Sequence, residues 1–171
     1  MLLSSLEYSD EEMQLALLMN NVEVSFNIET KDGRIIVQKL VYLAKELGYI
    51  VNDEYEYNWY YNGPYCPQLA LNYYSLRAKL IDGVYDFIGR DIKEEEIVPV
   101  NKLKELVAAK PEGILSDWFE LIASIDYLYK RFPDHDFVLK CLEDDPHKKR
   151  LVKDGMFDKA YSAMDGVLIN V

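Results

Sequence analysis

The chain has 171 residues, half of them hydrophobic, with 30 acidic against 19 basic side chains and a formal net charge of −11. This length and composition predict one domain with a sizeable core and exclude an intrinsically disordered chain. The net charge repels phosphate backbones, so it also argues against non-specific binding of nucleic acid.

The N-terminal part predicts a helix followed by a weak strand. Ser9 precedes three acidic residues, which indicates a helix start with Ser9 as the N-cap and Glu12 at the capping-box position. We expect the helix to end near Asn20 and Asn21. Residues 22–28, VEVSFNI, then alternate apolar and polar side chains at the period of a strand, although a buried loop or a continued helix fits the same letters.

Residues 34–47 form the clearest predicted helix, after an expected turn at Asp32 and Gly33. An apolar stripe recurs at spacings of three and four, and its members are Ile36, Leu40, Leu43, Ala44 and Leu47. Lys39 lies off that stripe, so we treat it as a candidate binding residue. Gly48 stands where a helix stop is expected.

Residues 55–61 read as a strand with one aromatic face. That face carries Tyr55, Tyr57, Trp59 and Tyr61, which we expect to pack against the stripe of helix 34–47. Asn62, Gly63 and Pro64 break the strand. Tyr60 and Tyr65 are the aromatic residues expected to stay accessible, and both are candidate binding residues.

The next predicted helix covers residues 68–81 and carries two further candidate binding residues, Arg77 and Lys79, near its end. We expect a short strand at 84–89 and a surface segment at 90–100. Further helices are predicted at 101–110, at 117–132 with Ser116 as a cap, and at 134–145 with Asp134 as a cap.

The C-terminal part contains the only tight basic cluster and an apolar tail. The cluster consists of Lys148, Lys149, Arg150 and Lys153, and a solvated helix face is the favoured interpretation over a phosphate or acidic-partner contact. The tail, residues 166–171, could add an edge strand or dock at a homodimer interface.

The order of these elements predicts a mainly α protein with a small antiparallel β-sheet. We expect a single domain over residues 1–171, with a winged-helix-like core at about 9–90 and a C-terminal helical part at about 100–165.

Two blocks of the sequence, RIIVQKLVYLAKELG and YNWYYNGPYCPQLALNYYSL, together resemble a family pattern. The matching residues are Lys39, Leu40, Val41, Tyr42, Leu43, Tyr61, Gly63, Pro64, Tyr65, Pro67 and Leu69. The pattern is typical of YwgA-like proteins of bacteria and archaea and is more distantly similar to the Panacea (SocA/GepA-like) domain of toxin–antitoxin systems. Asn62 before the glycine, and Cys66 where serine or threonine is common, depart from it. The resemblance implies a compact, mainly α domain without established chemistry, and the Panacea relation implies a protein that neutralises another protein.

The sequence contains no pattern of catalytic or cofactor-binding residues. It has no phosphate-binding glycine loop, no nucleophile elbow and no zinc-protease motif, so we expect no cofactor. The DHD cluster at 134–136 favours a helix cap over a metal site, and the EDD cluster at 143–145 favours a solvated helix end. Cys66 and Cys141 are expected to be free, inert thiols in a reducing cytoplasm.

Three functions follow in order of preference. The first is a non-enzymatic interaction or regulatory protein, antitoxin-like in one version, that binds a protein partner. The second is a winged-helix transcriptional regulator that reads specific DNA with helix 68–81. The third is a metal-assisted enzyme using the two acidic clusters. No apolar run is long enough to span a membrane, and the acidic N-terminus is unlike a signal peptide.

Overall fold

The computed structural model describes residues 7–80 and 91–169, and in this part the fold is mainly α with one small antiparallel sheet, as predicted. The elements are α1 (Asp10–Val22), α2 (Lys31–Leu47), β1 (Asn58–Tyr60), β2 (Gly63–Tyr65), α3 (Pro67–Lys79), α4 (Glu94–Ala108), α5 (Leu115–Tyr129), α6 (His135–Asp144), the 3-10 helix η1 (Lys149–Gly155) and α7 (Met156–Met164). The strand expected at 84–89 lies outside the described residues.

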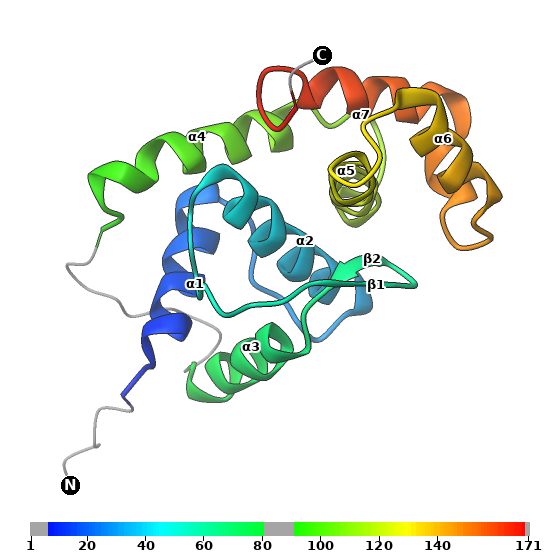
Figure 1. The fold of residues 1–171 in the computed structure, drawn as a ribbon. Coiled ribbons are helices and arrows are strands. Elements are labelled where there is room, and N and C mark those ends of the chain that lie inside the picture. The colour runs from blue at the N-terminus through cyan, green and yellow to red at the C-terminus, as the bar shows by residue number, and fades with distance from the viewer. Residues whose placement is uncertain (1–6, 81–90, 170–171) are drawn as a thin grey trace, which may run out of the picture.

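Helix α2 lies at the centre of the molecule and contacts α4, α5 and β2 (Figure 1). Helix α1 packs on α3 and α4, while α5 also contacts α6, α7 and η1. The expected stripe of α2 is buried at Leu40, Leu43 and Ala44. Burial is not limited to that stripe, however, because every residue from 37 to 44 is buried. Because the middle of α2 is enclosed by neighbouring elements, the Lys39 side chain in this segment does not reach solvent.

Several helix ends are set by the side chains that the sequence indicates. Ser9 and Glu12 form the predicted capping box of α1, and Asp134 caps α6 by accepting a hydrogen bond from the Phe137 amide at 2.7 Å. Gly48 ends α2 with a positive φ of 103°. The prediction for Ser116 was wrong, because α5 begins at Leu115 and the Ser116 hydroxyl instead donates to Asp32 at 3.1 Å.

Helix α2 begins three residues earlier than expected, so the turn predicted at Asp32 and Gly33 was also wrong. Thr30 is the N-cap, and its hydroxyl accepts a hydrogen bond from the Gly33 amide at 3.0 Å. A side chain at position 33 would collide with the chain, since a Cβ there would lie 1.5 Å from the Asn27 carbonyl oxygen. The glycine therefore allows a close backbone approach within the first helical turn.

Two further predictions, a strand at 22–28 and a surface segment at 90–100, were wrong or only partly right. Residues 23–28 form no strand: α1 continues to Val22, and Val24 and Ile28 are buried from an irregular loop. The charged segment 90–100 is not wholly a surface segment, because α4 starts at Glu94 and buries Pro99 and Val100. Alternating polarity and local charge depend only on residues that are close in sequence. Burial of these two segments depends instead on packing against helices that are distant in sequence.

The aromatic strand is shorter than predicted and covers only Asn58–Tyr60. Tyr55 is buried and Tyr57 and Trp59 are partly buried against the core, so the inward face is confirmed for these three. Tyr61 is 70% exposed, so its predicted burial was wrong. The reason is that Tyr61 lies in the turn between β1 and β2, where the alternation of a strand no longer applies.

Candidate functional site

The turn between β1 and β2 is held by two buried lysines. The Lys39 Nζ donates a hydrogen bond to the Pro64 carbonyl at 2.7 Å, and the Lys148 Nζ donates to the Tyr61 carbonyl. Lys39 is 1% exposed and Lys148 is fully buried. Lys39 therefore cannot reach a partner, and its assignment as a binding residue was wrong. Likewise Lys148 is not part of a solvated helix face, as the basic cluster had suggested.

The charge of these lysines is balanced mainly by one buried carboxylate, Glu120 of α5. Its Oε1 lies 3.2 Å from the Lys148 Nζ. Its Oε2 lies 3.0 Å from a guanidinium nitrogen of Arg150 and accepts a 3.3 Å hydrogen bond from the side-chain Nδ2 of Asn62. Burial lowers the pKa of Lys39 to about 7, although Glu120 opposes the shift. Burial also lowers the pKa of Lys148, again against the attraction of Glu120.

The asparagine–glycine–proline block shapes the same turn. Gly63 has a φ of 85°, and a Cβ there would lie 2.6 Å from the Ser124 Oγ, so the position requires glycine on two grounds. Pro64 pairs with Trp59 in the hairpin register. Proline has no amide hydrogen and cannot donate to the ladder, while its carbonyl accepts the hydrogen bond from Lys39. The block that carries the family resemblance thus has a structural role here.

Exposed aromatic side chains remain on the outer side of the hairpin. Tyr60 is 48% exposed, in line with the prediction, and Tyr65 is half-buried. Their ring centroids lie 5.2 Å apart in an edge-to-face arrangement. The structure thus brings these two predicted binding residues together on the hairpin, whereas Lys39 contacts the hairpin from the buried side.

Helix α3 presents an apolar outer face that we call the α3 stripe, which consists of Pro67, Leu71, Tyr74 and Ala78. All four are exposed, Leu71 by 72% and Tyr74 by 52%. They recur at spacings of four, three and four, parallel to the buried set Leu69, Tyr73, Leu76 and Leu80. This stripe was not among the predicted sites, although a second apolar series on one helix is a signal that the sequence contains.

The two basic candidates on α3 face back toward the protein. The Arg77 Nε lies 2.9 Å from the Glu29 carboxylate, and the Lys79 Nζ lies 2.7 Å from the carboxylate of Glu12 on α1. Glu12 is itself buried and also accepts a hydrogen bond from Ser75 at 2.5 Å. Arg77 and Lys79 are therefore engaged in ion pairs beside the α3 stripe rather than forming a basic face.

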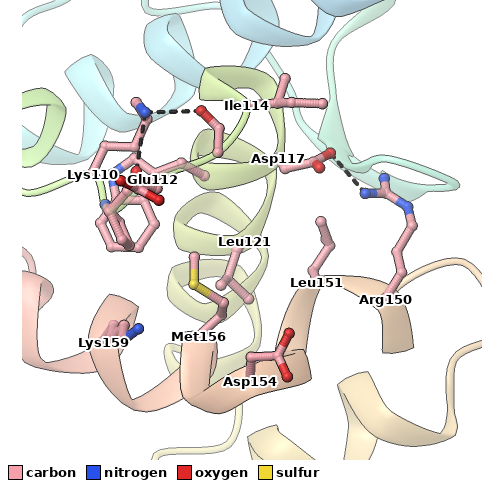
Figure 2. Close-up of a pocket in the computed structure, with 13 residues that line it drawn as sticks. Lys110, Glu112, Ile114, Asp117, Leu121, Arg150, Leu151, Asp154, Met156 and Lys159 are labelled. Carbon is pink, nitrogen blue, oxygen red and sulfur yellow. Dashed lines mark hydrogen bonds and ion pairs between the residues drawn. The ribbon is translucent and has the colours of Figure 1, made fainter.

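A pocket of about 470 Å³ lies between α5 and the η1–α7 segment (Figure 2). Its apolar lining includes Leu121, Leu151 and Met156, with Asp117 and Arg150 at one end. Arg150 lies 2.7 Å from Asp117, and the Lys110 Nζ at the other end donates to the carbonyls of Pro111 and Gly113. These charged groups are satisfied by one another or by the backbone, so they do not converge on the space between them.

The DHD cluster at 134–136 has local partners. Asp134 caps α6, while the His135 ring lies 2.9 Å from Asp136 and 3.3 Å from Asp158. Hydrogen bonding to Asp136, then to Asp158, raises the pKa of His135. Over residues 7–80 and 91–169, no group of three or more histidine, cysteine, aspartate or glutamate side chains is arranged to hold a metal ion.

The Cys66 thiol is buried and acts as the N-cap of α3, with its sulfur 3.4 Å from the Leu69 amide. This position matches the inert thiol expected from the sequence. The role also explains how cysteine can stand where serine or threonine is common, because all three side chains offer an acceptor to the first helical turn.

Comparison of the chain with protein-family models, with curated proteins and with solved structures gave no match. The resemblance to YwgA-like proteins and the Panacea domain therefore stays a prediction. Within the described ranges, no helix has both the length and the apolar character needed to cross a bilayer.

Proposed function

We propose that the protein is a non-enzymatic interaction protein that binds a protein partner through the α3 stripe. The observation that carries the proposal is the exposure of Leu71 and Tyr74 at helical spacing on one face. Large apolar side chains that form a continuous exposed patch usually mark a contact with another protein.

The charges around the α3 stripe suggest the chemistry of the partner. The Tyr55 hydroxyl donates to Asn72 of α3 at 2.5 Å, which places the segment with the exposed residues Glu54 and Glu56 beside the helix. Glu29 lies on the other side, next to Arg77. An amphipathic helix with an apolar face and basic flanks would complement this surface, and the net charge of −11 would attract it.

The DNA-reading alternative has weaker support. A recognition helix needs free basic or amide side chains toward the groove and further phosphate contacts. Apart from Gln68, the exposed residues of α3 are apolar, whereas Arg77 and Lys79 pair with Glu29 and Glu12. The antitoxin-like role is one form of the proposal, in which the captured partner is a toxin that the protein neutralises.

Affinity capture from the native host tests the proposal with matched variants. Leu71→Glu combined with Tyr74→Glu places two charges in the α3 stripe and should abolish recovery of the partner, since desolvating two unpaired carboxylates is costly. Val98→Glu is the control, because Val98 is an exposed apolar residue on α4 with 61% of its surface accessible. The proposal requires a protein that the wild type and V98E retain and the double variant loses. Equal recovery by all three proteins would refute it.

A further inference from the structure

A second candidate site lies on the opposite side of the hairpin tip from the α3 stripe. It is an open pocket of about 350 Å³, and we call it the hairpin pocket. Its lining consists of Trp59, Tyr60 and Tyr61 from the hairpin and Asp145 and His147 from the connection between α6 and η1. Segments separated by more than eighty positions in the chain thus meet around one space.

The lining has the chemistry of a receptor for an organic cation. Aromatic ring faces attract cations, and tryptophan and tyrosine do so most strongly. The Tyr61 and His147 rings meet edge to face at 4.4 Å, which fixes one wall of the pocket. The Asp145 Oδ1 accepts a hydrogen bond from the His147 amide at 2.7 Å, and this carboxylate forms no salt bridge to a basic side chain of the described residues.

Two of the cations near this pocket, Lys148 and Arg150, have ion-pair partners. The Lys148 Nζ lies 5.3 Å from the centroid of the Trp59 ring and 3.2 Å from the Glu120 carboxylate. On the far side of the Tyr61–His147 pair, Arg150 and Lys31 line a neighbouring pocket. Arg150 is matched by Asp117 and Glu120, so Asp145 is a carboxylate on the aromatic side that forms no ion pair, although Lys148 attracts it at longer range.

We propose that the hairpin pocket binds an alkylated ammonium group, the chemistry shared by small quaternary ammonium compounds and methylated lysine side chains. The rings would contact the methyl groups and Asp145 would supply the counter-charge. A metal cation fits less well, because such ions require several oxygen ligands close together and this lining offers mostly ring carbon. The inference goes beyond the proposed function and uses none of the residues of the α3 stripe.

The scaffold around the pocket is suited to binding because the hairpin is held in place before a ligand arrives. Lys148 and Lys39 hold the carbonyls of Tyr61 and Pro64, and Gly63 packs closely on Ser124. Rings on a fixed turn lose little conformational freedom on binding, which favours affinity.

A titration followed by nuclear magnetic resonance tests the proposal. The indole signal of Trp59, assigned with Trp59→Phe, should shift saturably with choline and should not shift with 3,3-dimethylbutan-1-ol, its uncharged isostere. Tyr61→Ala and Asp145→Asn should each weaken choline binding about tenfold, as expected for loss of one ring face or of the counter-charge. Both changes are mild for folding, because the Tyr61 ring is exposed and asparagine still offers an acceptor to the His147 amide. Tyr74→Ala, on the α3 stripe, is the matched control and should bind choline as the wild type does.

Peptide titrations distinguish the two sources of the cation. A peptide with one trimethyllysine should move the Trp59 signal, whereas the same peptide with unmodified lysine should bind much more weakly. Tighter binding of the methylated peptide than of choline would assign the pocket to a partner's side chain, and equal binding would assign it to a free small molecule. The proposal is overturned if the uncharged isostere binds as well as choline, if Tyr61→Ala binds choline normally, or if no cation moves the Trp59 signal.

Discussion

Burial of Lys39 and Lys148 removes two ammonium groups from water, and the hairpin turn supplies the groups that compensate. Each lysine donates to a turn carbonyl, and Glu120 provides a charge of opposite sign. A buried ion pair of this kind contributes little net stability, but loss of one member leaves the other uncompensated. The contacts therefore matter chiefly for fixing the position of the turn.

The lowered pKa of Lys39 predicts a pH dependence of stability. The folded-state pKa is about 7 against an ordinary value of 10.5, so between these values the unfolded chain binds a proton that the folded chain does not. Stability should therefore rise with pH across this window. In urea unfolding, the wild type should gain on the order of 1–2 kcal/mol relative to Lys39→Met between pH 7 and pH 9. Lys159→Met, which removes an exposed lysine, is the control, and a constant difference between wild type and K39M would contradict the prediction.

Substitution of Gly63 should be costly for two separable reasons. Gly63→Ala places a side chain at a φ of 85° and 2.6 Å from the Ser124 Oγ, and we expect a loss of about 1–3 kcal/mol from the backbone alone. Gly155→Ala is the matched control, since its φ is 72° but no atom lies within 4 Å of the added Cβ. G63A should lose more than G155A in urea unfolding, and Ser124→Ala should recover the excess. If the losses in free energy of unfolding of G63A and S124A simply add in the double variant, the close contact between the two positions is unimportant.

At the level of single elements, three helix ends were predictable from local sequence, although the cap expected at Ser116 was wrong. Ser9, Gly48 and Asp134 act through side chains or backbone within a few residues, so their roles can be read from local sequence. Elements that depend on distant partners were not predictable in this way. The alternation of residues 22–28 suits a strand, but among the described residues these positions pair with no strand, and Val24 and Ile28 are buried from a loop instead.

The cap of α6 provides a direct test at this scale. Asp134→Ala should destabilise the protein by about 1 kcal/mol, because the Phe137 amide loses its acceptor. Asp134→Ser should restore most of that loss, since a hydroxyl also caps. Thermal or urea unfolding of the two variants measures the difference, and equal stabilities of D134A and D134S would exclude a capping role.

On the scale of the whole molecule, α2 and α5 join the N-terminal and C-terminal parts into one core. The Tyr42 hydroxyl of α2 donates a hydrogen bond to the Asp126 carboxylate of α5 at 2.7 Å. The Trp59 ring of the hairpin packs on the Tyr127 ring of α5, with 5.5 Å between the ring centroids. The mainly α class was predictable from periodicity, but this junction was not, because no local pattern indicates which helices meet. For the same reason the lining of the hairpin pocket could be predicted only in part: the sequence indicated that Tyr60 is accessible, but it did not connect Asp145 and His147 to the hairpin.

This junction predicts that the part expected to be a winged-helix-like core does not fold alone. A fragment of residues 1–90 lacks α5 and Lys148, so the apolar face of α2 and the carbonyl of Tyr61 would be left without partners. We expect a poorly dispersed nuclear magnetic resonance spectrum for the fragment and recovery of native dispersion on co-expression with residues 91–171. A well-dispersed spectrum of the isolated fragment would instead establish two independent folding units.

The positions of the two lysines along the chain also bear on the order in which the native contacts form. Lys39 is 25 positions from its acceptor at Pro64, whereas Lys148 is 87 positions from its acceptor at Tyr61. Closing the longer loop costs more chain entropy, so the second contact should form after the first. The transition state for folding is thus expected to contain the Lys39–Pro64 contact but not yet the Lys148–Tyr61 contact, with a φ-value near zero for Lys148→Met.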